Sequence, residues 1–164
     1  MKAIFISLAV FGSVTLAQAQ LNFDANLDGL QEVPPNASPG YGSADFTLVG
    51  TNLSVDAGTG SYVDLLGNTL TAQIRDAAVG VNGPLVFTLT LDNPGTTTGS
   101  FSGSGVLTTP QITDLDAGNL YLNITSNVFP SGEIRGQILP VPEPTTLALA
   151  GMGTLALLAV RRKI

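Results

Sequence analysis

Hydrophobic and polar residues alternate with a period of two along most of the chain. Phe23, Ala25 and Leu27 fall on one side of an extended segment, and the Asp and Asn residues between them fall on the other. The same alternation recurs in three later segments, at 44–48, 70–74 and 85–91. Because successive side chains of a β-strand point to opposite faces, this period predicts strands with one buried and one hydrated face.

Gly, Pro and Asn gather between these segments, in PPNASPGYG, DAGTG, VNGP and DNPGTTTG. Such clusters are typical of hairpin turns. Two further runs, NLYLNITS and GEIRGQI, predict a last hairpin. Many short strands joined by turns predict an all-β domain, an antiparallel Greek-key β-sandwich or barrel. An immunoglobulin-like sandwich and a superoxide-dismutase-like barrel both fit the pattern.

One helical signal interrupts the strands, in TTPQITDLDAG. Thr109 is a suitable cap, Pro110 fits the first turn, and Gly118 is a suitable stop. Ile112 and Leu115 lie three residues apart and would anchor this short helix to the sheet.

The N-terminal segment has the three parts of a secretory signal peptide. Lys2 precedes an apolar run over 3–16, and Ala17 and Ala19 form a small-x-small cleavage site. We therefore expect residues 1–19 to be a signal peptide removed after Ala19, rather than a buried helix.

The C-terminal segment is organised in a similar way. Pro142, Glu143 and Pro144 end the last strand, because proline lacks an amide donor. Sixteen uncharged residues follow at 145–160, about 24 Å as a helix and slightly short of the roughly 20 residues that span a bilayer. They are followed by the basic residues Arg161, Arg162 and Lys163. A basic cluster there would hold the tail on the cytoplasmic side of a membrane, so hydrophobic helices are expected at both ends.

Taken together, Pro-Glu-Pro, the short apolar helix and the Arg-rich end resemble the PEP-CTERM sorting signal of Gram-negative bacteria, over residues 141–164. The resemblance implies recognition by an exosortase, transient anchoring in the inner membrane and processing near Pro142. The body would then reach the cell surface or the exopolysaccharide matrix. A plain membrane anchor is the alternative.

The body between these ends, residues 20–140, is a single strongly acidic domain. It contains eleven acidic and two basic residues, a formal charge of −9. Such a surface repels nucleic acid, because phosphate binding depends on Lys and Arg. The chain has no Cys and no His, which excludes zinc fingers, thiol nucleophiles and Ser-His-Asp catalysis.

Three segments of the body resemble the chordin-type, or CHRD, domain: 23–35, 72–86 and 115–138. The motifs QEVPP and GEIRGQ are the most specific parts of the match. The resemblance implies an extracellular β-domain of largely uncharacterised activity, of the kind found in bacterial surface proteins and in the secreted antagonist chordin.

The chain departs from this family at one group of positions. Bacterial members commonly read Ala-His-Ile-His at 72–75 and Asn-Val-His-Thr at 123–126, and such histidines could converge on a metal ion. This chain has Gln73, Arg75 and Thr125 there. An arginine only donates hydrogen bonds and stays charged, so we expect no metal site and no cofactor.

The two body cations, Arg75 and Arg135, are further candidates. On a strand, Glu133 and Arg135 share a face about 7 Å apart. We hypothesise that Arg75, Glu133 and Arg135 form a polar hydrogen-bonded cluster with a structural role. The alternative is that each meets solvent or a surface Asp.

Acidic residues leave other functions open. DANLDG, at 24–29, matches the start of a calcium loop but lacks its Glu at the twelfth position, which is Pro35. Asp114 and Asp116 could form a looser calcium site. The leading expectation is a non-enzymatic surface or matrix protein that binds extracellular polysaccharide or matrix proteins. The alternative is a metal-binding or carboxylate-based catalytic domain.

Overall fold

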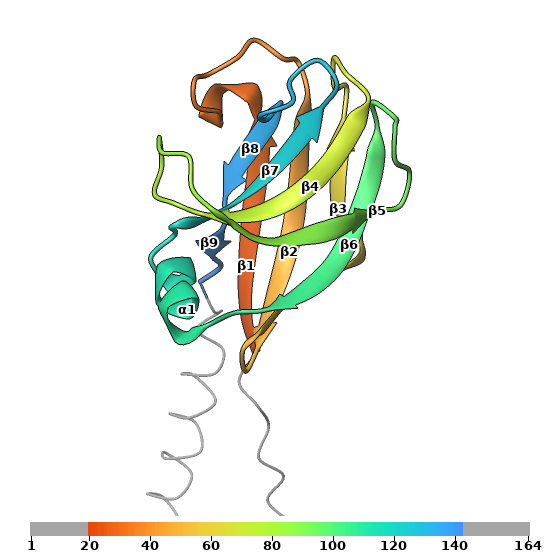
Figure 1. Ribbon diagram of the computed structural model, residues 1–164. Helices are drawn as coiled ribbons and strands as arrows, with labels where there is room; N and C mark the ends of the chain where they lie inside the picture. Colours follow the sequence, from red (N-terminus) through yellow and green to blue (C-terminus); the bar gives the residue numbers. More distant parts are fainter. Residues whose placement is uncertain (1–19, 143–164) are drawn as a thin grey trace, which may run out of the picture.

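The computed structural model describes residues 20–142, and strands make up most of this part of the chain (Figure 1). The predicted all-β class is confirmed. The strands are β1 (Gln20–Asp28), β2 (Tyr41–Val49), β3 (Asn52–Val63), β4 (Thr69–Asp76), β5 (Leu85–Leu91), β6 (Gly99–Val106), β7 (Leu120–Ser126), β8 (Ile134–Gln137) and β9 (Leu139–Pro140). The helices are η1 (Gly29–Gln31), a single 3₁₀ turn, and α1 (Thr109–Asp116).

Eight of the strands close into an antiparallel barrel. Neighbours follow the order β2-β3-β6-β5-β4-β7-β8-β1, and β1 pairs with β2 at nine positions to complete the ring. The short β9 continues along β1 beyond β8. The connections from β3 to β4 and from β6 to β7 each pass over two strands of the ring, as in a Greek key. The choice between sandwich and barrel is thus decided in favour of a barrel.

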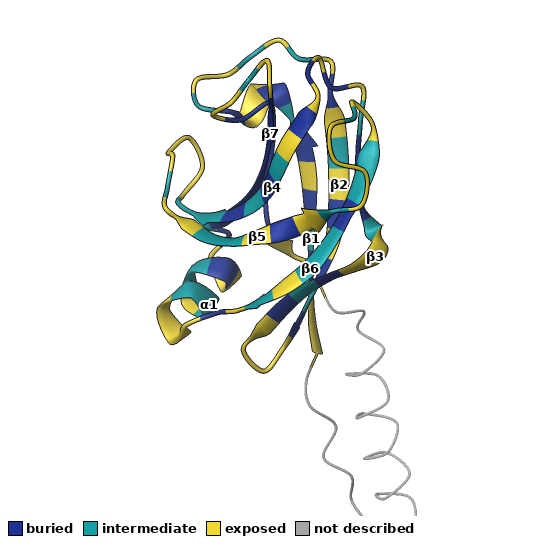
Figure 2. Cartoon of the chain, turned by 45° about the vertical axis from the view of Figure 1, so that its right-hand side comes forward, coloured by how far each residue is buried: buried dark blue, intermediate teal, exposed yellow. Residues whose placement is uncertain are grey.

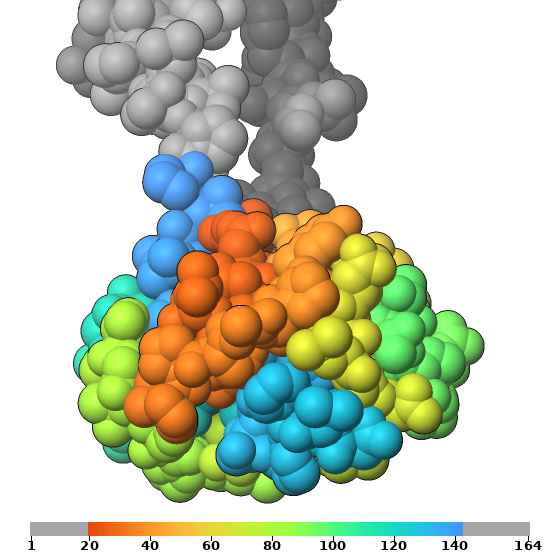
Figure 3. Space-filling view, turned by 90° about the horizontal axis from the view of Figure 1, so that it is seen from above, coloured from red at the N-terminus to blue at the C-terminus, as the bar shows by residue number. Residues whose placement is uncertain are grey.

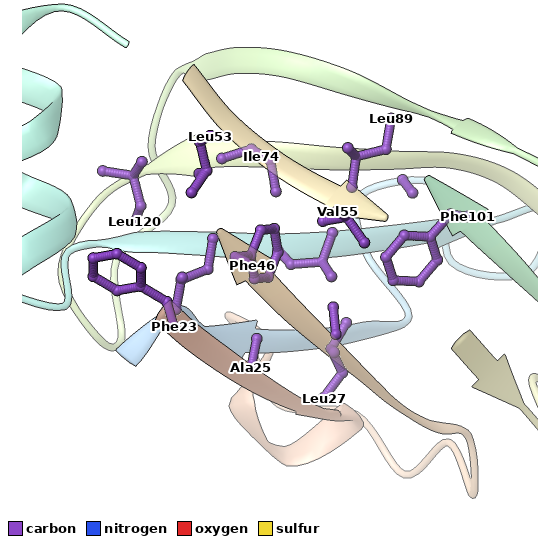
Figure 4. Packing of buried hydrophobic residues seen from close by; sticks show 14 of the residues in the cluster. Phe23, Ala25, Leu27, Phe46, Leu53, Val55, Ile74, Leu89, Phe101 and Leu120 are labelled. Carbon is purple, nitrogen blue, oxygen red and sulfur yellow. The ribbon is translucent and has the colours of Figure 1, made fainter. Parts of the chain in front are cut away.

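One apolar core fills the barrel. Phe23 and Leu27 of β1, Phe46 of β2, Ile74 of β4 and Phe101 of β6 point into the same space (Figure 4) and are each 2% exposed or less. The alternation predicted for β1 and β2 is confirmed, since the residues between these positions face outward. Burial of these side chains is the main favourable contribution to folding.

The alternation in 85–91 predicts burial correctly at only part of β5. Leu89 is buried, but Leu85 is 51% exposed and Phe87 is half-buried. The reason is the pairing of this strand, because β5 meets β6 only at Thr90 and Leu91. The earlier half of β5 has its register with β4 alone, so its side chains are less enclosed.

Irregular pairing corrects two more predictions. Leu70 was expected to share the buried face of β4 but is 52% exposed, because the register with β7 shifts between Thr69 and Thr71. The segment DAGTG, at 56–60, is not the predicted turn between strands. It lies inside β3, where the pairing with both β2 and β6 changes register.

The predicted helix is confirmed, with its cap one residue earlier. The N-cap is Thr108, whose backbone N–H donates to Gln111 Oε1 at 2.9 Å, a capping-box contact. Leu115 is fully buried against the barrel, and Gly118 adopts a φ of 72° just beyond the helix, as the predicted stop requires.

Both ends of the described chain leave the barrel at the same end (Figure 1). β9 pairs with the start of β1, and the Val141 N–H donates to Asn22 O at 2.9 Å. Within residues 20–142 no helix is long and apolar enough to span a membrane. The predicted signal peptide with Ala17 and Ala19 lies outside the described residues. So do the segment predicted to form a C-terminal apolar helix and the tail residues Glu143, Pro144, Arg161, Arg162 and Lys163.

Candidate functional site

The outward face of β4, β7 and β8 carries a layer of polar side chains. Alternation sends Ile74, Leu122 and Ile124 into the core and their neighbours outward. Register then aligns the outward residues across three strands, Gln73 with Asn123 and Arg135, and Arg75 with Tyr121 and Gln137. We call these six residues, together with Thr71 and Thr125, the outer polar layer.

This layer is itself largely buried. Every residue of β7 and β8 is buried, so both faces of these strands are covered (Figure 2). Three segments lie over the layer or beside it: 32–40, the 77–84 loop and the turn at 127–133. Segments 32–40 and 127–133 lie at the end of the barrel away from the termini, and the 77–84 loop lies at its side (Figures 1 and 3). The Asn82 side chain bonds Val33 O at 2.8 Å, and the Asn36 side chain bonds Glu133 O at 3.0 Å.

Arg135 is the centre of the layer. It is 1% exposed, and its guanidinium carbon lies 3.5 Å from the centre of the Tyr121 ring. Its Nη1 donates to Val81 O at 2.9 Å, and its Nη2 donates to Ala78 O at 3.2 Å and Gln137 Oε1 at 2.9 Å. Burial lowers the pKa of the Arg135 guanidinium, against the opposing effects of Tyr121 and Glu32. The arginine therefore holds the 77–84 loop onto the barrel.

Neighbouring side chains bind the same loop. Gln137 Nε2 donates to Gly118 O at 2.7 Å and to Ala77 O at 3.2 Å. The Tyr121 hydroxyl accepts from the Gly83 N–H at 3.0 Å. The polar residues of GEIRGQ thus satisfy loop carbonyls that would otherwise be buried without partners, a situation that costs free energy.

Glu133 belongs to a different network. Its carboxylate is fully buried and accepts from the Ser38 hydroxyl at 2.6 Å and from the N–H groups of Leu66 and Gly67. These contacts tie the segment before β2 and the β3–β4 loop to the start of β8. Within residues 20–142 Glu133 forms no ion pair with Arg75 or Arg135. The predicted cluster is therefore corrected: the two arginines hold the 77–84 loop, and Glu133 holds two other segments.

Arg75 lies beside a cleft of about 400 Å³ on the outer polar layer. Its Nε donates to Gln73 Oε1 at 2.9 Å and its Nη1 to Gly83 O at 2.8 Å. The lining consists of amides, hydroxyls, one guanidinium and two apolar side chains: Leu70, Thr71, Gln73, Arg75, Asn82, Tyr121, Asn123, Thr125, Pro130 and Ser131. No acidic residue is among the residues that form this cleft.

The three positions at which the chain departs from the resemblance all line this cleft. Gln73 and Arg75 come from β4 and Thr125 from β7. They do not suit a metal ion, because the Gln73 oxygen already accepts from a guanidinium that remains positively charged. Among residues 20–142 no group of three Asp or Glu side chains is placed to hold a metal ion. What the cleft offers instead is a set of hydrogen-bond donors and acceptors.

The calcium-like segment at 24–29 has structural contacts of its own. Asp28 caps η1 by accepting from the N–H groups of Leu30 and Gln31 at 2.9 and 3.0 Å. Asn26 donates to Asp24 along the outward face of β1. The strand interpretation accounts for this alternation.

Sequence reasoning missed one buried pair, Glu32 and Asn123. In the described structure neither Glu32 Oε1 nor Asn123 Oδ1 has a hydrogen-bond partner. Both oxygens lie within 2.7 Å of the point that a Cβ on Gly132 would occupy, so they approach each other where glycine leaves space. Burial raises the pKa of the Glu32 carboxyl to about 7, although Arg135, the Val33 N–H and Arg75 oppose the rise. If the Glu32 carboxyl is protonated, its O–H is a hydrogen-bond donor beside the acceptor Asn123 Oδ1.

The comparisons with known proteins agree with both resemblances. The CHRD domain family matches residues 23–138, and the PEP-CTERM protein-sorting motif matches residues 140–163. The second motif is the signal that exosortase recognises, so the chain is an exported, exosortase-sorted protein. Comparison with curated proteins and with solved structures returned no match.

Replacing Arg135 should weaken the fold far more than replacing Arg75. Arg135→Lys cannot reproduce the planar fork, and it leaves loop carbonyls buried without a donor. We expect its free energy of unfolding to fall by about 2–4 kcal/mol in urea titrations. Arg75→Lys, at a partly exposed site, should lose less than about 1 kcal/mol. Equal losses for the two variants would contradict the role assigned to Arg135.

Glu32 should make stability depend on pH. Its pKa rises from 4.5 to about 7 on folding, so the folded protein binds a proton between these values that the unfolded chain releases. The stabilisation of the folded state by this proton is fully present below pH 4.5 and is lost as the pH rises through 7. Melting temperatures should therefore fall between pH 5 and pH 8 by more in the wild type than in Glu32→Gln. Parallel pH curves for the two proteins would show that Glu32 is ionised in both states.

Proposed function

We propose that this chain, which belongs to the CHRD domain family and carries an exosortase sorting motif, is a non-enzymatic interaction protein of the bacterial surface or exopolysaccharide matrix. The observation that carries the proposal is the cleft on the outer polar layer, lined by amides and hydroxyls with one guanidinium. The volume of this cleft lies in the usual range of ligand sites, about 300–1,000 Å³, and its lining is more polar than that of most such sites.

The chemistry of the lining favours a hydrated polymer as the ligand. Asn82 and Ser131 are exposed side chains that both donate and accept hydrogen bonds, as the hydroxyl groups of a sugar do, and the paired hydroxyls of Thr71 and Thr125 lie beside them in the lining. The cleft is held by strands rather than by loops alone, since Gln73 and Arg75 lie on β4 and Asn123 on β7. A rigid, polar surface of this kind suits repeated binding along a polysaccharide. A matrix protein is the other partner that we propose.

The position of the cleft supports a role at a surface. It lies on the outer face of β4 and β7, between the 77–84 loop at the side of the barrel and the 127–133 turn at the end away from the termini (Figure 1). During the transient inner-membrane anchoring that we propose, the tail would hold the domain from its other end. The binding face, on the side of the barrel, would then be open to the periplasm and later to the matrix of a Gram-negative bacterium.

Carboxylate-based catalysis is the alternative, and the cleft does not favour it. Glycoside hydrolysis uses two carboxyl groups that flank the scissile bond, whereas no carboxyl group lines the cleft. The buried Glu133 carboxylate is occupied by a hydroxyl and two backbone N–H groups. The residues that line the cleft therefore suit ligand binding better than carboxylate-based catalysis.

The sorting signal should be removed close to the edge of the barrel. Val141 is still hydrogen-bonded to Asn22, so the barrel extends as far as the residue before the Pro-Glu-Pro motif. We expect mass spectrometry of the surface-released protein to find a C-terminus near residues 142–144 and an N-terminus near Gln20. Recovery of Arg161, Arg162 and Lys163 in that fraction would contradict processing.

Blocking the cleft should abolish retention on the polymer. Ser131 is exposed at the rim of the cleft, so Ser131→Trp would fill the cleft without disturbing the core. We expect the mature variant to lose at least about tenfold in affinity for exopolysaccharide purified from the producing bacterium, in a sedimentation assay. Ser104→Trp is the matched control, because Ser104 is an exposed residue of β6 outside the cleft. Equal retention of both variants would contradict the proposed function.

A further inference from the structure

The two body arginines have different surroundings, and only one of them can serve a ligand. Arg135 is 1% exposed and its guanidinium is engaged by loop carbonyls, Gln137 and the Tyr121 ring. Arg75 is half-buried and lines the cleft. A guanidinium has five N–H groups, and within the described residues those of Arg75 make two hydrogen bonds. Three N–H groups therefore remain for another partner.

The guanidinium of Arg75 is held in a fixed orientation. Gln73 Oε1 accepts from Nε at 2.9 Å, and Gly83 O accepts from Nη1 at 2.8 Å. Because the Gln73 oxygen is used in this way, its NH₂ group is the part of the amide left to donate to a ligand. The cleft therefore presents an ordered guanidinium beside a second donor. An ordered site loses less conformational entropy on binding than a flexible one.

No side chain that lines the cleft carries a charge opposite to that of Arg75, because Glu32, whose carboxyl Arg75 influences, is buried and does not line the cleft. All the other lining side chains are neutral, although the body as a whole carries eleven acidic residues. Planar, bidentate pairing with a carboxylate is the interaction that a guanidinium makes best. The group that completes the site is thus an oxyanion, and a planar carboxylate fits the fork of donors.

The remainder of the lining favours a sugar over a peptide as the carrier of that carboxylate. Asn82, Thr125 and Ser131 line the same cleft as the arginine, and their amide and hydroxyl groups match the hydroxyls of a sugar ring. An extended peptide usually binds by adding to a free strand edge. Here β4 is paired with β5 on one side and β7 on the other, and β7 is also paired with β8. The face of the sheet offers side chains but no free backbone edge.

We propose that Arg75, assisted by Gln73, binds the carboxylate of a uronic acid unit in an extracellular polysaccharide. This inference rests on the proposed function, because it names the class of polymer that the same cleft recognises. Arg75 supplies the charge and the fork, and the neutral lining binds the ring hydroxyls. The acidic surface elsewhere repels the same polymer, so binding is confined to this cleft. Salt weakens the repulsion by screening the charges.

The experiment compares an acid with its ester. Trigalacturonic acid and its methyl ester are titrated calorimetrically into the mature protein at 150 mM salt. Esterification removes the negative charge and keeps the ring hydroxyls. We expect the wild type to bind the acid about tenfold or more tightly than the ester, the difference typical of a charge-assisted hydrogen bond. Arg75→Gln should bind both with equal, weakened affinity.

A matched variant controls for total charge. Asn52→Asp shifts the net charge by the same amount as Arg75→Gln, at an exposed position on β3 outside the cleft. It should keep the preference for the acid. Melting temperatures confirm that each variant is folded, and the comparison of acid with ester in the wild type needs no variant at all.

The possible failures are distinguishable. Equal binding of acid and ester by the wild type would overturn the inference and leave polysaccharide binding intact. A preference for acid that persists in Arg75→Gln, or no binding of trigalacturonic acid, would also overturn it. Binding of a poly-glutamate peptide as tightly as the sugar acid would assign the carboxylate to a protein partner instead. The proposed function falls separately, if the Ser131→Trp and Ser104→Trp proteins are retained equally on exopolysaccharide.

Discussion

The structure around the candidate site depends on one buried cation, Arg135. Its guanidinium lies 3.5 Å from the centre of the Tyr121 ring and binds Val81 O and Ala78 O. A buried charge is expensive unless hydrogen bonds and favourable dipoles replace its hydration. Loop carbonyls and an aromatic face provide these contacts here, so the cation and the 77–84 loop require each other.

The cleft follows from this arrangement. With the 77–84 loop fixed, Gly83 O is in place to orient Arg75, and Asn82 is in place to bond Val33 O. Glu133 then fixes two further segments through Ser38, Leu66 and Gly67. The signature GEIRGQ thus has a structural role on β8, and the cleft lies beside it on β7 and β4. Arg135 holds the loop in place, whereas Arg75 is the arginine that we propose for binding.

Much of the fold could be predicted from local patterns. Alternation identified β1 and β2 correctly, and the cap and stop signals located α1 to within one residue at its start. Predictions failed where strand pairing is irregular, at Leu70, Leu85 and the segment 56–60. Periodicity shows which residues alternate along one strand. Whether the register shifts, or whether a neighbouring strand is absent, depends on a second strand that is distant in the sequence.

The sequence by itself determined the sorting signal, the all-β class, the acidic composition and the absence of His and Cys, because these depend on residue types and their local order. Only the tertiary structure decided that the strands close into a barrel. It also separated Glu133 from the arginines, and it placed Glu32 beside Asn123 at Gly132. These outcomes depend on which loops cover the outer polar layer, where loop carbonyls compete for a buried guanidinium with a carboxylate two residues away. Here the carbonyls bind Arg135, and the Glu133 carboxylate binds Ser38 and two backbone N–H groups instead. No local pattern in the chain encodes that competition.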